Sequence, residues 1–285
     1  MSKTHSAVVT DQFGPRAHAY VESAVHAQGE DLDALAGIIE QAAPIRALDL
    51  GSGGGHVAYR MALHAKNVVA LDISSDMLAA IAATAGSKGL SNIETVQAPV
   101  ERLPFGDASF DFLASRFSAH HWRDFEAGLR QARRVLRSGA AALFIDVFAP
   151  RSALLDTHLQ AVELLRDNSH VRDHTVDEWI SALARARFSL GTIRTWRLRM
   201  DFEIWTGRMC TPELRRNAIR ALQQAAPAEV QAHFSIENDG SFMLDVFMLE
   251  QAFHEIEFEL THRPEWVRLP LSGALRLLGI DSGAI

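Results

Sequence analysis

The sequence predicts an α/β protein with a doubly wound, mostly parallel β-sheet. Over residues 31–150, short apolar runs rich in β-branched residues alternate with segments whose apolar residues recur at helical spacing. Strands that alternate with helices form βαβ units, which give a parallel sheet with right-handed crossovers. A glycine-rich segment, residues 51–55, directly follows the first apolar run. In doubly wound folds this connection lies at the carboxyl edge of the sheet, where ligands bind.

The elements of the first half follow from apolar periodicity and from residues that start or stop a helix. The last helix shows the clearest pattern, because Phe125, Leu129, Ala132 and Leu136 step by four, three and four residues. Strands are expected at residues 46–50, 68–72, 93–97, 110–115 and 140–147. Helices are expected from Asp31 to Pro44, over residues 56–65, from a cap at Ser74 or Ser75 to Gly86 or Gly89, and from Phe125 to near Gly139.

The second half is less regular. A helical stretch over residues 151–191 is expected, followed by a strand at 192–200, helix within 203–235 and a strand at 242–249. A late antiparallel edge strand on a parallel sheet is a common arrangement. We therefore expect one domain over residues 1–250, with residues 251–285 as a C-terminal extension of unknown role. A dimer arm, a lid and a disordered end are the open interpretations of this extension, so a homodimer is one of them.

The composition is that of a folded globular protein. Of 285 residues, 48% are hydrophobic and 22% are charged, which is enough apolar material for a sizeable core. The net charge of -7 argues against a mainly electrostatic grip on nucleic acid. The single cysteine, Cys210, excludes an internal disulfide framework. Because no signal peptide and no apolar stretch of membrane-spanning length is found, a soluble, cytoplasmic protein without a membrane partner is expected.

The glycine-rich segment also indicates which cofactor the sheet binds. A dinucleotide fingerprint has its third glycine three residues after the second, where this chain has a histidine; here the glycines are Gly51, Gly53 and Gly55. Asp49, at the end of the strand, would repel a pyrophosphate but attract the ammonium of a methionine moiety. Asp72, about 20 residues on, is placed to accept hydrogen bonds from ribose hydroxyls. These residues favour S-adenosylmethionine (SAM), with ordinary turn chemistry as the alternative reading of the glycines.

The chain resembles the class I SAM-dependent methyltransferases over about residues 13–249, particularly the small bacterial UbiE-like or MenG-like branch. The matching segments are residues 49–55, residues 71–74 with Met77 and Leu78, and residues 101–105, 110–111 and 133–139. A subgroup of uncharacterised bacterial methyltransferases is more similar still, through residues 118–122, Asp146 with residues 149–150, and residues 165–172. The resemblance implies a seven-stranded sheet of order 3-2-1-4-5-7-6, with the last strand antiparallel and a helical cap.

The resemblance also implies cofactor contacts at four connections of the sheet. Asp49, Gly51, Ser52 and Gly53 would line the methionine part of SAM, and Asp72 its ribose. Residues Ile73 and Met77, with Pro99 and Val100, would surround the adenine; Ser115 and Arg116 would lie beside the sulfonium. The product would be S-adenosylhomocysteine.

Methyl transfer from a sulfonium is an in-line displacement on an activated carbon, so the protein mainly supplies positioning and a desolvated site. If the acceptor is a hydroxyl or a protonated amine, a histidine can take the proton. His120 and His121 follow the fourth strand and are the candidate catalytic residues. The alternative is that one satisfies backbone groups while the other is a solvated surface residue.

A small-molecule acceptor is expected, covered by helical segments in residues 151–191 and 203–235. Tyr20, His170 and Arg172 are the candidate substrate-binding residues, against packing and a helix-end charge network as alternatives. No metal is expected, because the 13 histidines show no metal-ligand spacing. A SAM-binding protein without activity, and a methyltransferase acting on protein or RNA, remain open. The glycine spacing disfavours a third reading, an NAD-dependent oxidoreductase.

Overall fold

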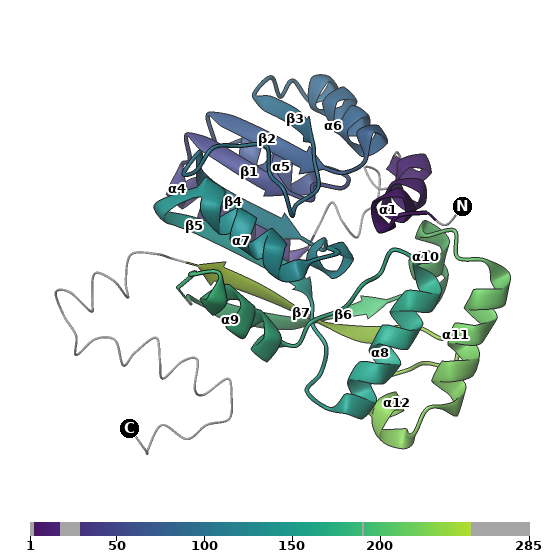
Figure 1. Cartoon of the computed structure of the whole chain (residues 1–285). Helices are drawn as coiled ribbons and strands as arrows, with labels where there is room; N and C mark the ends of the chain where they lie inside the picture. Colours follow the sequence, from purple (N-terminus) through teal and green to yellow (C-terminus); the bar gives the residue numbers. More distant parts are fainter. Residues whose placement is uncertain (1–2, 18–28, 190, 252–285) are drawn as a thin grey trace, which may run out of the picture.

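The computed structural model describes residues 3–17, 29–189 and 191–251. Its centre is one sheet of seven strands in the order β3-β2-β1-β4-β5-β7-β6 (Figure 1). The predicted α/β class and strand order are therefore confirmed. The strands are β1 (Arg46–Leu50), β2 (Asn67–Asp72), β3 (Ile93–Gln97), β4 (Phe110–Arg116), β5 (Leu136–Val147), β6 (Ile193–Met200) and β7 (Phe242–Gln251).

The first five strands pair in parallel, and β7 pairs antiparallel with both β5 and β6. Strand β7 is therefore inside the sheet, and β6 forms the edge beyond it. The confirmed order already has this arrangement, so the common pattern of a late antiparallel edge strand does not apply to β7. Strand β7 reads as a nearly continuous apolar run because residues on both of its faces are buried, as expected for an interior strand.

The predicted helices of the first half are present with shifted ends. The helices that the structure describes are α1 (His5–Phe13), α4 (Glu30–Ala42), α5 (His56–Ala62), α6 (Ser75–Ser87), α7 (Phe125–Val135), α8 (Ala153–Arg166), α9 (Val176–Arg185), α10 (Phe202–Arg208), α11 (Glu213–Ala225) and α12 (Ala228–Phe234). Ser74 caps α6 by accepting from the backbone N–H of Met77. Helix α7 passes directly into β5 at Leu136, so that strand starts four residues before the predicted Ala140.

The predicted helical stretch over residues 151–191 consists of two helices on different parts of the sheet. Helix α8 ends at Arg166, and α9 begins only after Thr175, whose side chain forms a capping box with Glu178. Helix α9 packs with α7 through Trp179, which contacts the rings of Phe144 and Phe247. Helices α8, α10, α11 and α12 gather beside β6 and β7 (Figure 1). The irregular segment between α8 and α9 contains four buried polar residues, Asp167, Ser169, His170 and Asp173.

Apolar side chains cover both faces of the sheet. Helix α4 buries Leu32, Leu35 and Ile39, three of the apolar residues whose spacing predicts it. No helix among residues 3–17, 29–189 and 191–251 is long and apolar enough to cross a membrane. From position 252 onward the predicted extension lies outside the described residues. The structure therefore does not test the interpretations given for its role.

Candidate active site

The glycine turn after β1 has the backbone that its sequence requires. Gly51, Gly53 and Gly55 all have positive φ angles, of 74°, 50° and 79°. A Cβ atom on Gly51 would lie 1.9 Å from the hydroxyl of Ser118, and one on Gly53 would meet nothing within 4 Å. The turn thus brings bare backbone close to the carboxyl ends of β1 and β4.

Two carboxylates flank this turn. Asp72, the last residue of β2, accepts hydrogen bonds from the backbone N–H groups of Gly53 and Ser74, each at 2.9 Å. Asp49, on β1, accepts one from the N–H of Ala58 at 3.0 Å. Burial raises the pKa of Asp49 to about 7 and also raises the pKa of Asp72. A cationic group of a ligand would stabilise the ionised form of Asp49.

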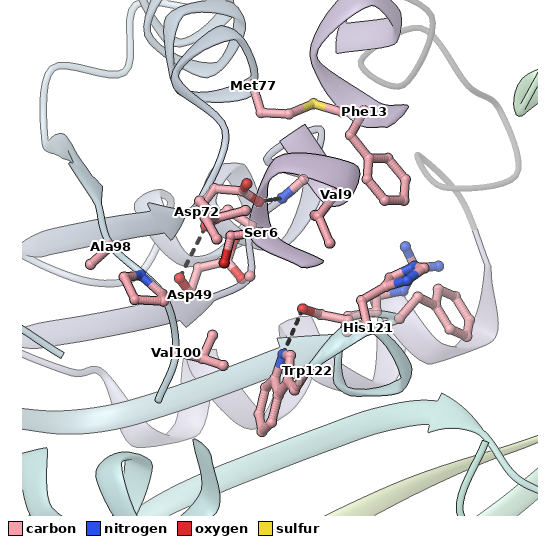
Figure 2. Close-up of a pocket in the computed structure, with 18 of the residues that line it drawn as sticks. Ser6, Val9, Phe13, Asp49, Asp72, Met77, Ala98, Val100, His121 and Trp122 are labelled. Carbon is pink, nitrogen blue, oxygen red and sulfur yellow. Dashed lines mark hydrogen bonds between the residues drawn. The ribbon is translucent and has the colours of Figure 1, made fainter. Parts of the chain in front are cut away.

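A cavity opens over these residues, with about 1010 Å³ of empty space (Figure 2). This first cavity lies at the carboxyl edge of the sheet, where cofactors bind in doubly wound folds. Of the predicted cofactor residues, Ser115 does not line it and lies buried within β4. The other predicted residues line it: Asp49, Gly51, Ser52, Gly53, Asp72, Ile73, Met77, Pro99, Val100 and Arg116.

Helix α1 forms another wall of the first cavity, which sequence reasoning did not predict. His5, Ser6, Val9 and Phe13 line the cavity from this helix. Nε2 of His5 lies 2.9 Å from the carbonyl oxygen of His121, which ties the helix to the segment after β4. The resemblance begins only at about residue 13, so of this helix it covered Phe13 alone. Tyr20, a predicted substrate-binding residue, lies outside the described residues.

Arg116, at the end of β4, is buried and forms an ion pair with Asp31 of α4. Its guanidinium carbon also lies 4.6 Å from the centre of the Phe117 ring. Asp31 thus neutralises the positive charge of Arg116 at the wall of the first cavity. Asp31 was predicted only as the start of a helix.

A second cavity, with about 610 Å³ of empty space, lies on the side of β6 and β7. It shares Phe13, Phe117 and His121 with the first cavity. Its other lining residues are His120, Val147, Glu163, Arg166, Asp173, Leu198, Met200, Trp205, Arg208 and Leu244. Helices α8 and α10, from the two segments predicted to cover an acceptor, each contribute two of these residues.

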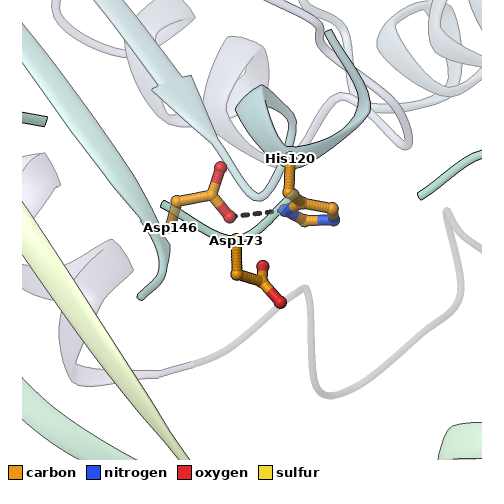
Figure 3. A group of neighbouring side chains, drawn as sticks. All are labelled: His120, Asp146 and Asp173. Carbon is orange, nitrogen blue, oxygen red and sulfur yellow. Dashed lines mark hydrogen bonds and ion pairs between the residues drawn. The ribbon is translucent and has the colours of Figure 1, made fainter. Parts of the chain in front are cut away.

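His120 lines the second cavity and is held by Asp146. Nδ1 of His120 lies 2.6 Å from Oδ1 of Asp146 (Figure 3). Asp146 itself is fixed at the end of β5, because it accepts hydrogen bonds from the backbone N–H groups of Ala119 and Val147, both at 2.9 Å. Burial alone would lower the pKa of His120, but the charge and hydrogen bond of Asp146 outweigh it and raise the pKa to about 9. This contact places the Nδ1 proton toward Asp146 and leaves Nε2 for other partners.

His121 lines both cavities and is held in the neutral form. Burial and the neighbouring His120 lower the pKa of His121 to about 4. Its Nδ1 lies 3.1 Å from the carbonyl oxygen of Ser169, which fits a neutral ring that donates from Nδ1. The ring of Phe13 packs edge-on against it, with 5.0 Å between ring centres.

The other two predicted substrate residues line neither cavity. His170 is buried behind His120, with 5.9 Å between ring centres, and its Nε2 lies 2.9 Å from Oε1 of Gln160. Arg172 lies at the surface near α9, where it pairs with Asp156 at 3.1 Å and with Glu178 at 3.3 Å. The structure thus places Arg172 in a charge network at a helix end, the alternative considered for it.

His120, Asp146 and Asp173 offer metal-ligand atoms that all lie within 4.8 Å of one another (Figure 3). The distance of 2.6 Å between His120 Nδ1 and Asp146 Oδ1 is as short as that of a charge-assisted hydrogen bond. Two ligands at right angles around a small divalent ion, with bonds of about 2.1 Å, would be ~3 Å apart. The geometry of this group therefore fits proton chemistry better than coordination.

Comparison with known proteins identifies the chain. The family described as "Methyltransferase domain" matches residues 48–144, which run from β1 into β5. The uncharacterized protein YafE of Escherichia coli is 40% identical over 196 residues, 69% of this chain and 95% of its own length. The uncharacterized methyltransferase YcgJ of Bacillus subtilis is 32% identical over 79% of this chain and 88% of its own length. The chain belongs to the SAM-dependent methyltransferases.

The crystal structure of YcgJ supports this membership. It matches with a TM-score of 0.73 and 29% identity, and covers 77% of this chain and 97% of the YcgJ chain. The expected likeness to the UbiE branch is present at lower coverage. A ubiquinone/menaquinone biosynthesis C-methyltransferase UbiE of Sinorhizobium fredii is 35% identical over only 41% of this chain and 46% of its own length. Similarity to YafE and to YcgJ extends over most of the chain.

Sequence reasoning missed the residues that build the second cavity. Asp146 was named for the resemblance to a subgroup of methyltransferases, and Asp173 and Glu163 were not singled out. Asp146 does carry a signal, because it is a carboxylate within the otherwise apolar end of a predicted interior strand. The pairing of Asp146 with His120, 26 positions earlier, depends on β4 and β5 being neighbours.

Proposed function

We propose that the enzyme transfers the methyl group of SAM, held in the first cavity, to a small-molecule acceptor held in the second. The observation that supports this most strongly is the shared wall, since Phe13, Phe117 and His121 line both cavities. Because the same side chains border both cavities, a donor and an acceptor bound in the two cavities would lie next to each other at these residues, as an in-line displacement requires. The aromatic side chains would exclude water from the reacting atoms.

In this proposal, the described residues of the first cavity hold the cofactor through charge and shape. Asp49 pairs with the ammonium of the methionine moiety, which keeps its carboxyl group ionised. Asp72 accepts hydrogen bonds from the ribose, and Ile73 and Met77 pack near the adenine. Asp31 neutralises Arg116, so the end of β4 does not repel a sulfonium. When bound, SAM supplies a methyl group on an already activated carbon, and S-adenosylhomocysteine is the product.

His120 is the residue we assign to the proton of the acceptor. Asp146 fixes the ring and raises the pKa of His120 to about 9, so His120 can accept a proton only in its neutral form, whose share increases as the pH approaches 9. His121 has a pKa of about 4 and is a weak base in the same surroundings. We therefore separate the two predicted catalytic residues: His120 takes the proton, and His121 helps to form the wall between the cavities.

A small acceptor is favoured over a protein or an RNA. The second cavity is lined by side chains from α1, α8, α10, β6 and β7, which surround a bound molecule rather than offering it one open face. The net charge of -7 gives no general attraction for RNA.

The proposal is tested by following a tritium-labelled methyl group. The purified enzyme is incubated with labelled SAM and a desalted cell extract to which the small-molecule fraction is added back or withheld. We expect label in the organic-extractable, low-molecular-weight fraction, only when that fraction is added back. The His120→Gln variant should bind SAM normally and lose most of the transfer, with Asp177→Asn, an exposed carboxylate paired with Arg151, as the matched control.

Two results would contradict the proposal. Label in acid-precipitable protein or RNA would show a macromolecular acceptor. Tight binding of SAM with no transfer to any fraction would support the alternative of a SAM-binding protein without methylation activity.

A further inference from the structure

The second cavity holds a buried carboxyl oxygen that the proposed proton transfer does not use. Asp173 lines this cavity and is only 2% exposed, and its Oδ2 has no hydrogen-bond partner among the described residues. Nε2 of His170 is 3.9 Å from Oδ2 of Asp173, which is too far for a hydrogen bond. A buried polar atom without a partner is costly, so an atom in this position indicates a ligand group that would satisfy it.

Asp173 and His120 form a pair of polar groups on one side of the cavity. A ring nitrogen of His120 and a carboxyl oxygen of Asp173 lie within 4.8 Å of each other. Figure 3 shows the imidazole ring and the Asp173 carboxyl group extending to the same side, away from Asp146. Two groups this close can each form a hydrogen bond of about 2.8 Å to one ligand that carries two neighbouring polar atoms.

Three charged residues of the lining, His120, Glu163 and Arg166, are paired within the protein. His120 pairs with Asp146 at 2.6 Å, and Arg166 pairs with Glu163 at 3.0 Å. An ionised acceptor would lose its hydration without gaining a charged partner from these pairs. This arrangement selects against an acceptor that carries a full charge next to the reacting atom.

The remaining lining is mainly apolar and partly aromatic, with Arg208 as its further charged residue. Leu198, Met200 and Leu244 come from β6 and β7, and Trp205 comes from α10. The guanidinium of Arg166 lies over the Trp205 ring, 4.9 Å from its centre. Such a surface suits the flat or puckered face of a ring.

We infer that the second cavity binds an uncharged ring compound with two adjacent oxygen functions, one at His120 and the other at Asp173. This inference rests on the proposed function and names its substrate class. The hydroxyl at His120 is the one methylated: its proton passes to the imidazole, the oxygen bonds to the methyl carbon, and the bond from that carbon to sulfur breaks. The products are a methyl ether and S-adenosylhomocysteine, and His120 then releases its proton to solvent.

The test uses catechol as a probe with three matched analogues. Phenol lacks the second oxygen, resorcinol has it one carbon further away, and salicylate carries a charge in its place. Binding of each is titrated to the full-length protein saturated with S-adenosylhomocysteine, and methylation is followed with labelled SAM. We expect catechol to bind about tenfold more tightly than phenol or resorcinol, salicylate to bind most weakly, and label to appear in the monomethyl ether.

Variants of Asp173 connect this preference to the structure. Asp173→Leu should reduce the preference of catechol over phenol to about onefold, whereas Asp173→Asn, which can still hydrogen-bond, should keep part of it. Asp177→Asn serves as the matched control for loss of a carboxylate. Each variant is first shown to bind S-adenosylhomocysteine, so that a misfolded protein is recognised.

Several outcomes would overturn the inference. These are equal binding of catechol and phenol, an unchanged preference in Asp173→Leu, or tighter binding of salicylate. Catechol binding that is abolished by EDTA and restored by Mg²⁺ would instead assign the group around His120 to a metal. Failure of the protein to bind S-adenosylhomocysteine at all would count against the proposed function, and so the two failures are distinguishable.

Discussion

Replacing Asp146 with asparagine should remove a pH-dependent part of the stability of this enzyme. Burial alone would lower the pKa of His120, but its ion pair with Asp146, with smaller contributions from Asp173 and Glu163, raises the pKa from 6.5 to about 9. Because the pKa is higher in the folded state, the pair contributes stability that is fully present below pH 6.5 and lost as the pH rises through 9. At 1.36 kcal/mol per pH unit, the full contribution is on the order of 3 kcal/mol.

The assay is urea unfolding of the wild type and of Asp146→Asn at pH 6 and at pH 9.5. The substitution should lower the free energy of unfolding at both pH values. We expect the loss to be about 3 kcal/mol larger at pH 6 than at pH 9.5, because the contributions of other titrating groups are the same in wild type and variant and cancel. Any cost of weakened bonds to the backbone of Ala119 and Val147 should be similar at both pH values. NMR titration of the imidazole should show the pKa of His120 falling below 6.5 in the variant. An equal loss of stability at the two pH values would refute the reasoning.

Three further substitutions test other parts of the account. Asp72→Ala should weaken SAM binding by about 1–3 kcal/mol through lost charged hydrogen bonds, and unchanged affinity in calorimetry would remove Asp72 from the cofactor site. Gly51→Ala should abolish SAM binding because its Cβ would collide with Ser118, whereas Gly53→Ala adds only backbone strain; equal affinities would contradict this. Thr175→Ala should cost about 0.5–2 kcal/mol in urea unfolding by removing the cap of α9, and a larger loss of SAM affinity than of stability would argue against a purely structural role.

The first half of the fold could be predicted because its signals are local. The helix with Leu32, Leu35 and Ile39 and the strand from Arg46 to Leu50 follow from periodicity and from proline or glycine at their ends. The division of residues 151–191 into α8 and α9 was missed. The segment between them is held by contacts distant in sequence, such as the backbone N–H of Val171 donating to the carbonyl of His120 at 2.8 Å.

The two cavities also differ in whether they depend on local signals or on contacts distant in sequence. The first cavity is built around one turn and the ends of β1 and β2, so the residues Gly51, Gly53 and Asp72 could be selected from spacing alone. The second cavity combines α1, α8, α10, β6 and β7, and its key pairs, His120 with Asp146 and with Asp173, depend on how these elements pack. Sequence spacing carries no information on such contacts.

Isothermal titration of the purified protein with SAM, S-adenosylhomocysteine and NADH tests the central claim most directly. The account predicts micromolar dissociation constants for the first two ligands, which is about -8 kcal/mol of binding free energy, and no detectable binding of NADH. Binding of NADH, or no binding of SAM and S-adenosylhomocysteine, would contradict the assignment of the first cavity to the methyl donor.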